Sequence, residues 1–177
     1  YLSKMFQLYG FSADEAAKKA SAVFLHETTL ATFSKSRTEL RDPQANYNKM
    51  TLAEFKENYP NIPLEALANA EGIKSEYLKE MIVGQPAFFA GYDKVAAAEC
   101  AGTLKALMEW DIICSSASYL SDEIREARFE FFGKIMSGRK EDYPLWKRAT
   151  TQVEAQLGEA LGRIYCKRYF PESSKKM

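Results

Sequence analysis

The segment of this sequence with the clearest chemical potential is His26-Glu27-Thr28-Thr29-Leu30. In zinc peptidases, one helix carries two histidines one turn apart that bind the metal, and the glutamate after the first histidine activates water. Position 30 is leucine here, and His26 is the only histidine of the chain, so the second ligand is missing. The sequence therefore predicts no metal role for His26. An ordinary helix-surface or hydrogen-bonded histidine is the default interpretation.

Other catalytic motifs are also missing from the sequence. A Ser or Cys triad takes a histidine as its usual base, and only His26 is available. There is no glycine-rich phosphate loop, no Gly-x-Ser-x-Gly elbow and no Cys-x-x-Cys pair. We therefore assign no catalytic, cofactor-binding or metal-binding residue to this chain, and the substrate-binding residues are left open.

Two acidic residues, Glu27 and Asp111, lie among apolar neighbours in predicted helices. A buried carboxylate needs a cationic or hydrogen-bonding partner to offset its lost hydration. We expect each to form a structural ion pair rather than to act as a catalytic acid. Arg41, Lys49 or an arginine of a later helix are the candidate partners of Glu27, and simple exposure of the side chain is the alternative.

Composition describes a single well-packed domain. The chain has 177 residues, with 24 Lys and Arg against 24 Asp and Glu, so its formal net charge is zero. A hydrophobic content of 46% is enough for a real core. The balanced charge lacks the basic excess typical of proteins that bind duplex nucleic acid. No run of about 18 apolar residues occurs that would span a membrane.

The three cysteines do not form a disulfide framework. Cys100 and Cys114 lie in one predicted helix, where 14 residues at ~1.5 Å each separate them by roughly 21 Å, beyond the ~7 Å limit for a disulfide. At most one of them could pair with Cys166. Buried, apolar cysteines are the expected state.

Two helices are predicted in the first 36 residues. Apolar residues at helical spacing predict a helix that ends at Gly10 and has no capping residue before it. Because the chain begins with Tyr1 rather than Met, we expect an excised piece of a longer polypeptide. A capping box of Ser12 and Glu15 predicts a second helix from residue 12 to about 36. Its expected buried face comprises Ala16, Ala20, Val23, Phe24, Leu30 and Ala31.

The middle of the chain is less regular. A polar turn is expected around Arg41-Asp42-Pro43, since proline disfavours helical angles at Asp42, and a capping box of Thr51 and Glu54 starts a short helix through about residue 58. Another short helix is expected from Pro63 and ends before Gly72. Residues 80–84 read as one extended segment, or as a lone strand without a visible partner. Pro86 suits the first turn of a helix with one side formed by Phe89, Tyr92 and Ala96.

Three further helices complete an all-α prediction. The helix expected at 99–119 is apolar over much of its girth, which is typical of a central position in the core. The next starts at Ser121, ends at Gly138 and has the stripe Ile124, Ala127, Phe131 and Ile135. The last is expected over 143–170, ending at Pro171. Short connections favour antiparallel neighbours, so the predicted fold is a multi-helix bundle-like domain over residues 1–177.

Two features of the last third have structural interpretations. Gly158 and Gly162 are four residues apart and predict close packing against another helix, because charged neighbours exclude the membrane version of this motif. Basic residues concentrate around the turn at Gly138, interrupted by Glu141 and Asp142. A solvated loop is favoured there over an anion site.

Several strings of residues resemble the neprilysin and endothelin-converting-enzyme family of zinc metallopeptidases. The most specific is Arg41-Asp42-Pro43 followed by residues 47–52, Tyr-Asn-Lys-Met-Thr-Leu. Shorter matches follow in the same order along the chain: Leu30-Ala31, Leu107-Met108 with Trp110, Arg128 with Phe131, Trp146-Lys147-Arg148, and Gly162-Arg163 with Tyr165 and Phe170. The resemblance extends from the second helix to the end of the chain.

The resemblance implies a role without catalysis. In that family the His-Glu-x-x-His zinc site and a downstream glutamate belong to a catalytic domain C-terminal to the matching region. The matching region belongs to a mostly helical domain that faces the catalytic domain across an enclosed cavity. This chain is thus expected to be a lid that restricts substrates to small peptides. The resemblance implies that its partners are the parent's own catalytic domain, which holds the zinc, and the peptide substrates.

The same resemblance implies an exported parent that is membrane-anchored, secreted or periplasmic. The cysteine spacing departs from the disulfide-dependent animal enzymes and favours a bacterial relative. The competing hypothesis is a free-standing helical interaction module that uses its surface aromatics as partner contacts. An intact small enzyme is the third hypothesis.

Overall fold

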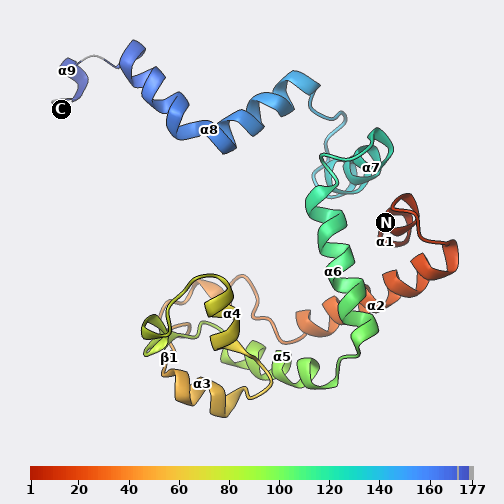
Figure 1. Cartoon of the computed structure of the whole chain (residues 1–177), viewed down its shortest axis with the longest axis vertical. Helices are drawn as coiled ribbons and strands as arrows, with labels where there is room; N and C mark the ends of the chain where they lie inside the picture. Colours follow the sequence, from red (N-terminus) through yellow and green to blue (C-terminus); the bar gives the residue numbers. More distant parts are fainter. Residues whose placement is uncertain (171, 176–177) are drawn as a thin grey trace. The chain divides into compact units, whose positions relative to one another are not determined.

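The computed structural model describes residues 1–170 and 172–175, and the chain divides into two compact units, with the boundary in the sequence after Arg125. In the described residues the regular secondary structure is helical except for one two-stranded sheet (Figure 1). The predicted all-α class is confirmed. In the part of the chain described, no helix is long and apolar enough to cross a membrane.

Helices α1 (Leu2–Leu8) and α2 (Ala13–Ala31) pack against each other at the start of the first unit. Gly10 joins them at a φ of 107°, a left-handed conformation that favours glycine. The predicted capping box is present: the Glu15 amide donates to the Ser12 hydroxyl, and Glu15 Oε2 accepts from the Ser12 amide. Met5 and Phe6 of α1 are fully buried, and the Phe6 ring lies 5.8 Å from that of Trp110.

The second helix is shorter than predicted and buries only part of the predicted face. The α-helix ends at Ala31. The amides of residues 32–34 donate to the carbonyls three residues back, instead of four back as in an α-helix. Ala16 and Val23 are buried, whereas Phe24 and Ala31, which were expected to be buried, are exposed. The inward face is therefore narrower than the apolar pattern indicates.

The expected turn around Pro43 joins a 3₁₀ helix, η1 (Glu39–Arg41), to the next elements. Asp42 Oδ1 accepts from the amides of Gln44 and Ala45, which closes the turn. Helix α3 (Leu52–Asn58) then begins with the predicted capping box of Thr51 and Glu54.

The expected extended segment is a strand, and it has a partner. Strand β2 (Met81–Ile82) pairs antiparallel with β1 (Lys49–Met50), with Lys49 opposite Ile82 and Met50 opposite Met81. Helix α4 (Leu64–Ala70) and the 3₁₀ helix η2 (Ser75–Leu78) lie between the strands in sequence. Phe55, Tyr59, Ile62 and Val83 form a buried cluster beside the strands, which we call the small core.

Helix α5 (Pro86–Ala98) begins with proline in its first turn, as predicted. Its Gly91 lies against the ring of Phe33: a Cβ at position 91 would be 2.2 Å from Phe33 Cγ. Such a distance is far below van der Waals contact, so the Phe33 ring occupies the space that any larger residue at 91 would need. Glycine at this position lets the end of the α2 region approach α5.

Helix α6 (Ala101–Ser116) packs against α1 and α2, but it is not the enclosed core helix that its composition predicts. Ala106 and Ile113 are buried, whereas Leu104, Met108 and Ile112 are exposed. These three exposed residues recur every four positions, so they form one apolar stripe along the helix. Figure 1 shows α6 crossing α2.

The chain continues from α7 (Asp122–Arg128) into a π-helix, η3 (Phe129–Ile135). The Met136 amide donates to Phe131 O, five residues back. Because this wider turn rotates the following residues, Ile135 is 72% exposed, and its predicted place in the buried stripe is wrong. Gly138 ends the region as predicted, at a φ of 65°.

Helix α8 (Leu145–Tyr169) has no buried residue and is kinked at Leu157, where φ is −124°. Within the second unit, no atom outside the helix backbone and the adjoining residues lies within 4 Å of the would-be Cβ positions of Gly158 and Gly162, so the predicted close packing against another helix stays a prediction. The four-residue α9 (Glu172–Lys175) follows. Pro171, the predicted end of the last helix, lies outside the described residues.

Candidate functional site

His26 lies on the inward side of α2 and forms a hydrogen bond with a residue far along the chain. Its Nδ1 is 2.7 Å from Oε2 of Glu99, between α5 and α6, and the two side chains are 9% and 18% exposed. This hydrogen bond joins α2 to the connection between the later helices. Of the default interpretations of His26, the structure has the hydrogen-bonded one.

Glu27, one residue further on, is exposed, and the structure gives it no ion pair among the described residues. Asp111 is likewise exposed and without an ion pair in the described part of the chain. The predicted structural ion pairs of both residues are therefore wrong, and the alternative of exposure holds. The reason is the rotation of α2, which turns His26 inward and Glu27 toward solvent.

A second ion pair links α2 to α6. Lys19 Nζ contacts Oε2 of Glu109, with both side chains 20% exposed, and the same ammonium lies 4.6 Å from the centre of the Phe11 ring. Lys105 also approaches Glu109 at 4.0 Å. Glu99 is thus hydrogen-bonded to His26 and Glu109 is paired with Lys19, whereas Glu27 and Asp111 have no basic partner among the described residues.

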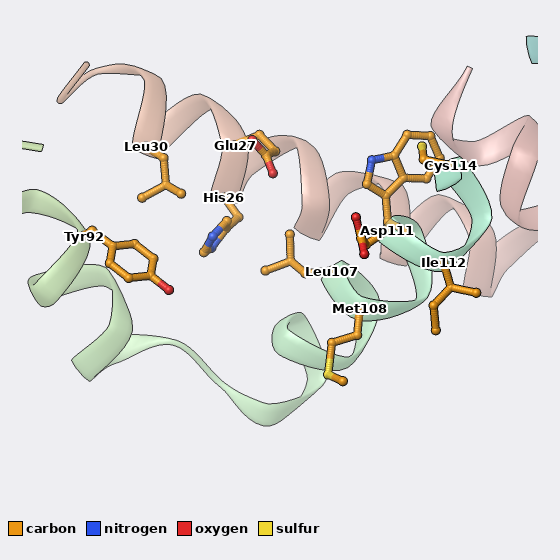
Figure 2. Close-up of a pocket in the computed structure, with 10 residues that line it drawn as sticks. His26, Glu27, Leu30, Tyr92, Leu107, Met108, Asp111, Ile112 and Cys114 are labelled. Carbon is orange, nitrogen blue, oxygen red and sulfur yellow. The ribbon is translucent and has the colours of Figure 1, made fainter. Parts of the chain in front are cut away.

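A cavity of about 590 Å³ opens between α2, α5 and α6, all within the first unit, and we call it the α2/α6 cleft. Its walls are His26, Glu27 and Leu30 from α2, Tyr92 from α5, and Leu107, Met108, Trp110, Asp111, Ile112 and Cys114 from α6. Figure 2 shows the side chains of His26, Leu30, Tyr92 and Leu107 turned toward the space between the three helices. Apolar walls with a few polar groups are typical of binding pockets.

The cleft does not fit a metal ion. Across residues 1–170 and 172–175, no three His, Cys, Asp or Glu side chains are grouped so that they could hold a metal. A zinc site takes three or four such ligands at about 2 Å. The arrangement can bind and orient a ligand through apolar contact, two carboxylates and the Tyr92 hydroxyl, and it offers no donor set for zinc.

The hydrogen bond from His26 lowers the pKa of Glu99 below its ordinary value of 4.5, with smaller contributions from Thr103 and the Cys100 amide. A carboxyl whose pKa is lower in the folded state binds fewer protons there than in the unfolded state. Its stabilising contribution is therefore complete above about 4.5 and is lost as the pH falls through the lower, folded pKa.

We expect Glu99→Gln to lower the free energy of unfolding by about 1 kcal/mol at pH 7, because a half-buried charged hydrogen bond becomes a neutral one. The difference from the unmodified chain should shrink as the pH is lowered from 5 to 3, since glutamine does not titrate. Urea unfolding at a series of pH values measures this. The exposed Glu57→Gln is the control, and a pH-independent difference for Glu99→Gln would contradict the linkage.

The cysteines are less buried than predicted. Cys100 and Cys166 are exposed and Cys114 is half-buried, and none of the three, all of which are described, forms a disulfide. Cys100 precedes α6, where the Thr103 hydroxyl and the amides of Gly102 and Thr103 lower the pKa of its thiol. The expectation of buried cysteines is wrong because Cys100 caps α6 and Cys166 lies on the uncovered α8.

The basic turn near Gly138 is organised by aromatic rings. The Arg139 guanidinium lies 5.2 Å from the centre of the Phe129 ring and 4.0 Å from that of Tyr143, and it also contacts Asp142. Lys147 lies 4.2 Å from the Tyr143 ring. These contacts use the basic side chains within the turn itself, in keeping with the predicted solvated loop.

The cleft was missed at the level of sequence because its walls come from three helices. The two acidic residues with apolar neighbours in the sequence, Glu27 and Asp111, do line the cleft, although neither has the predicted ion-pair partner among the described residues. Tyr92 and Met108 had no distinguishing signal, since each fits an ordinary apolar helix stripe.

Comparison with known proteins covers the whole chain. The sequence model for the N-terminal part of peptidase family M13 matches residues 1–177. Human neprilysin is 25% identical over 174 residues, which span 92% of this chain and 23% of neprilysin. Rat endothelin-converting enzyme 1 is 27% identical over 190 aligned positions, which span 100% of this chain and 24% of that enzyme.

A solved structure shows the same fold. The zinc metalloprotease Zmp1 of Mycobacterium tuberculosis, in its open state, matches with a TM-score of 0.91 at 27% identity, over 99% of this chain and 27% of that chain. This chain therefore spans about a quarter of the length of the relatives it matches.

Proposed function

The chain belongs to peptidase family M13 and corresponds to the N-terminal region of its members, and we propose that it is the non-catalytic helical lid of a zinc metalloendopeptidase. In the parent protein it encloses the active-site cavity and restricts substrates to small peptides. Its partners are the parent's own catalytic domain, which holds the zinc, and the peptides that enter the cavity.

The observation that carries this proposal is a family match over all 177 residues in a chain whose described residues offer no zinc ligand set. The His26-Glu27 pair lacks a second histidine one turn later. Its histidine is also engaged by Glu99. The division of labour between a zinc domain and an enclosing domain accounts for both facts.

The exposed apolar surface of α8 supports a role within a larger protein. Eight large apolar side chains of this helix are exposed: Leu145, Trp146, Val153, Leu157, Leu161, Ile164, Tyr165 and Tyr169. A monomeric protein rarely leaves so many on one element. We propose that the remainder of the parent polypeptide covers part of this helix, including the open positions at Gly158 and Gly162.

The proposal is tested by comparing the full-length parent with the 177-residue chain. The parent should hold one zinc per molecule and cleave short peptides, with kcat/KM falling steeply once the substrate is a folded protein. The chain alone should retain no stoichiometric zinc after dialysis and cleave no peptide. One equivalent of zinc in the chain alone, or equal cleavage of folded proteins by the parent, would contradict the proposal.

The exposed aromatics on α8, led by Trp146, favour one second candidate, a free-standing helical interaction module. The reading frame downstream of this chain separates the two functions. A His-Glu-x-x-His motif within a few hundred residues supports the peptidase lid, and its absence supports the interaction module. For the peptidase we propose an exported parent, and fractionation of cells that express it under its own promoter tests that location.

A further inference from the structure

We propose that the α2/α6 cleft is a peptide-binding subsite that prefers a cationic group next to an apolar side chain. The ligand is a stretch of peptide with lysine, arginine or a free N-terminal ammonium beside a residue such as leucine or phenylalanine. This inference rests on the proposed function, since it names the class of peptide that the lid would select.

Charge is the first argument. Glu27 and Asp111 line the cleft from α2 and α6, and in the described residues neither has a basic partner. The other acidic groups nearby already have partners, since Glu99 is hydrogen-bonded to His26 and Glu109 is paired with Lys19. The cleft therefore has two uncompensated negative charges, and a concave surface with low-dielectric walls strengthens their attraction for a cation.

Apolar contact is the second argument. Leu30 and Leu107 form the inner wall, and Met108 and Ile112 remain exposed at the edge of the cleft. Methionine is unbranched and adapts to side chains of different shape. A cavity of about 590 Å³ is within the range that holds a small ligand, so it accommodates an apolar side chain together with its cationic neighbour.

The third argument concerns the peptide backbone. Tyr92 lines the cleft from α5, and Figure 2 shows its ring below Leu30, at the α5 side of the cleft. No hydrogen bond holds this hydroxyl among the described residues. It is therefore available to donate to a peptide carbonyl, which would otherwise lose its hydrogen bond to water on entering an apolar site.

The test measures peptide selectivity of the full-length parent. Three peptides differ only at one position beside a leucine, which is lysine, norleucine or glutamate. We expect KM to be about fivefold lower for the lysine peptide than for the glutamate peptide, because two partly exposed charge contacts each contribute a modest factor. In the double variant Glu27→Gln, Asp111→Asn this ratio should fall to within about twofold.

The matched control is Glu57→Gln, Glu71→Gln, which removes two exposed carboxylates outside the cleft. It should keep the full charge preference. The subsite is overturned if the double variant in the cleft keeps the preference, or if the control loses it to the same extent. A charge preference set by the catalytic domain, or a cleft covered by the parent's own polypeptide, would give the first of these results.

A second readout does not depend on cleavage. A lysine-leucine peptide with a photoreactive benzoylphenylalanine is cross-linked to the parent, and the attachment point is mapped by mass spectrometry. Attachment within residues 104–112, suppressed by Glu27→Gln with Asp111→Asn, supports the subsite even in a parent that proves inactive. Attachment elsewhere overturns the subsite, while peptide cleavage by the same preparation leaves the lid proposal standing.

Discussion

Phe55→Ala is expected to lower the free energy of unfolding by about 3–5 kcal/mol, enough to unfold much of the small core. Phe55 is 2% exposed, and its ring packs edge-on against Tyr59 at 4.8 Å and Phe89 at 5.5 Å between ring centres. Truncation removes buried apolar area and two aromatic contacts, and it leaves a cavity that the short helix α3 cannot fill.

Urea unfolding of the 177-residue chain, followed by circular dichroism, measures the loss. Phe24→Ala is the matched control, since the same truncation on exposed α2 surface should change stability by less than about 0.5 kcal/mol. Phe55→Leu should recover more than half of the loss because it refills most of the volume. Equal effects of Phe55→Ala and Phe24→Ala would show that the small core is not formed in solution.

Asp93→Ala is expected to cost about 2–3 kcal/mol, by a different mechanism. Asp93 of α5 is 8% exposed, and its two carboxylate oxygens accept from the Asn61 amide at 2.7 Å and from Asn61 Nδ2 at 3.0 Å. These bonds hold the loop after α3 against α5. Alanine removes a charged acceptor from both donors at once, so the loop loses its attachment.

A double-mutant cycle separates the two hydrogen bonds. Asn61→Ala removes only the side-chain donor, and its amide still donates to Asp93. We expect its cost to be less than half that of Asp93→Ala, and the two substitutions together should cost little more than Asp93→Ala alone. Additive losses would mean that Asp93 and Asn61 act independently. Thermal unfolding with near-ultraviolet circular dichroism measures all four proteins.

Local signals were reliable predictors of where elements begin and end. The capping boxes at Ser12 and Thr51, the proline at the start of α5 and the glycine after η3 all mark real boundaries. Each depends on groups within a few residues of one another, so the sequence alone contains the interaction. The family resemblance was equally recoverable, and the match over residues 1–177 confirms it.

Features that depend on distant residues were not predictable in this way. The apolar character of α6 predicts a core helix, yet only the neighbours of a helix decide which of its faces is covered, and Met108 stays exposed. The partner of β2 lies before α3, and no local pattern at Lys49–Met50 marks a strand.

The candidate site shows the same division. A lone histidine could be recognised as an incomplete metal motif from sequence, because the spacing rule is local. Its actual partner, Glu99, is 73 residues away, and pairing them requires the packing of α2 against the later helices. The sequence shows that Glu27 and Asp111 have apolar neighbours, but it does not show whether they are buried and paired. Their exposure depends on the rotation of each helix about its axis.

The short sheet also bears on how this half of the chain folds. Its two strands are separated in sequence by α3, α4 and η2, so their pairing closes a long loop. The closure lowers the conformational entropy of the chain, and this cost comes before the strand contacts stabilise the protein. The helix at Thr51 needs no such closure. We therefore expect α3 and α4 to be structured in the folding transition state and the strands to pair after it. The β1–β2 pair would then mainly set how long the folded protein persists before it opens, with little effect on how fast it forms.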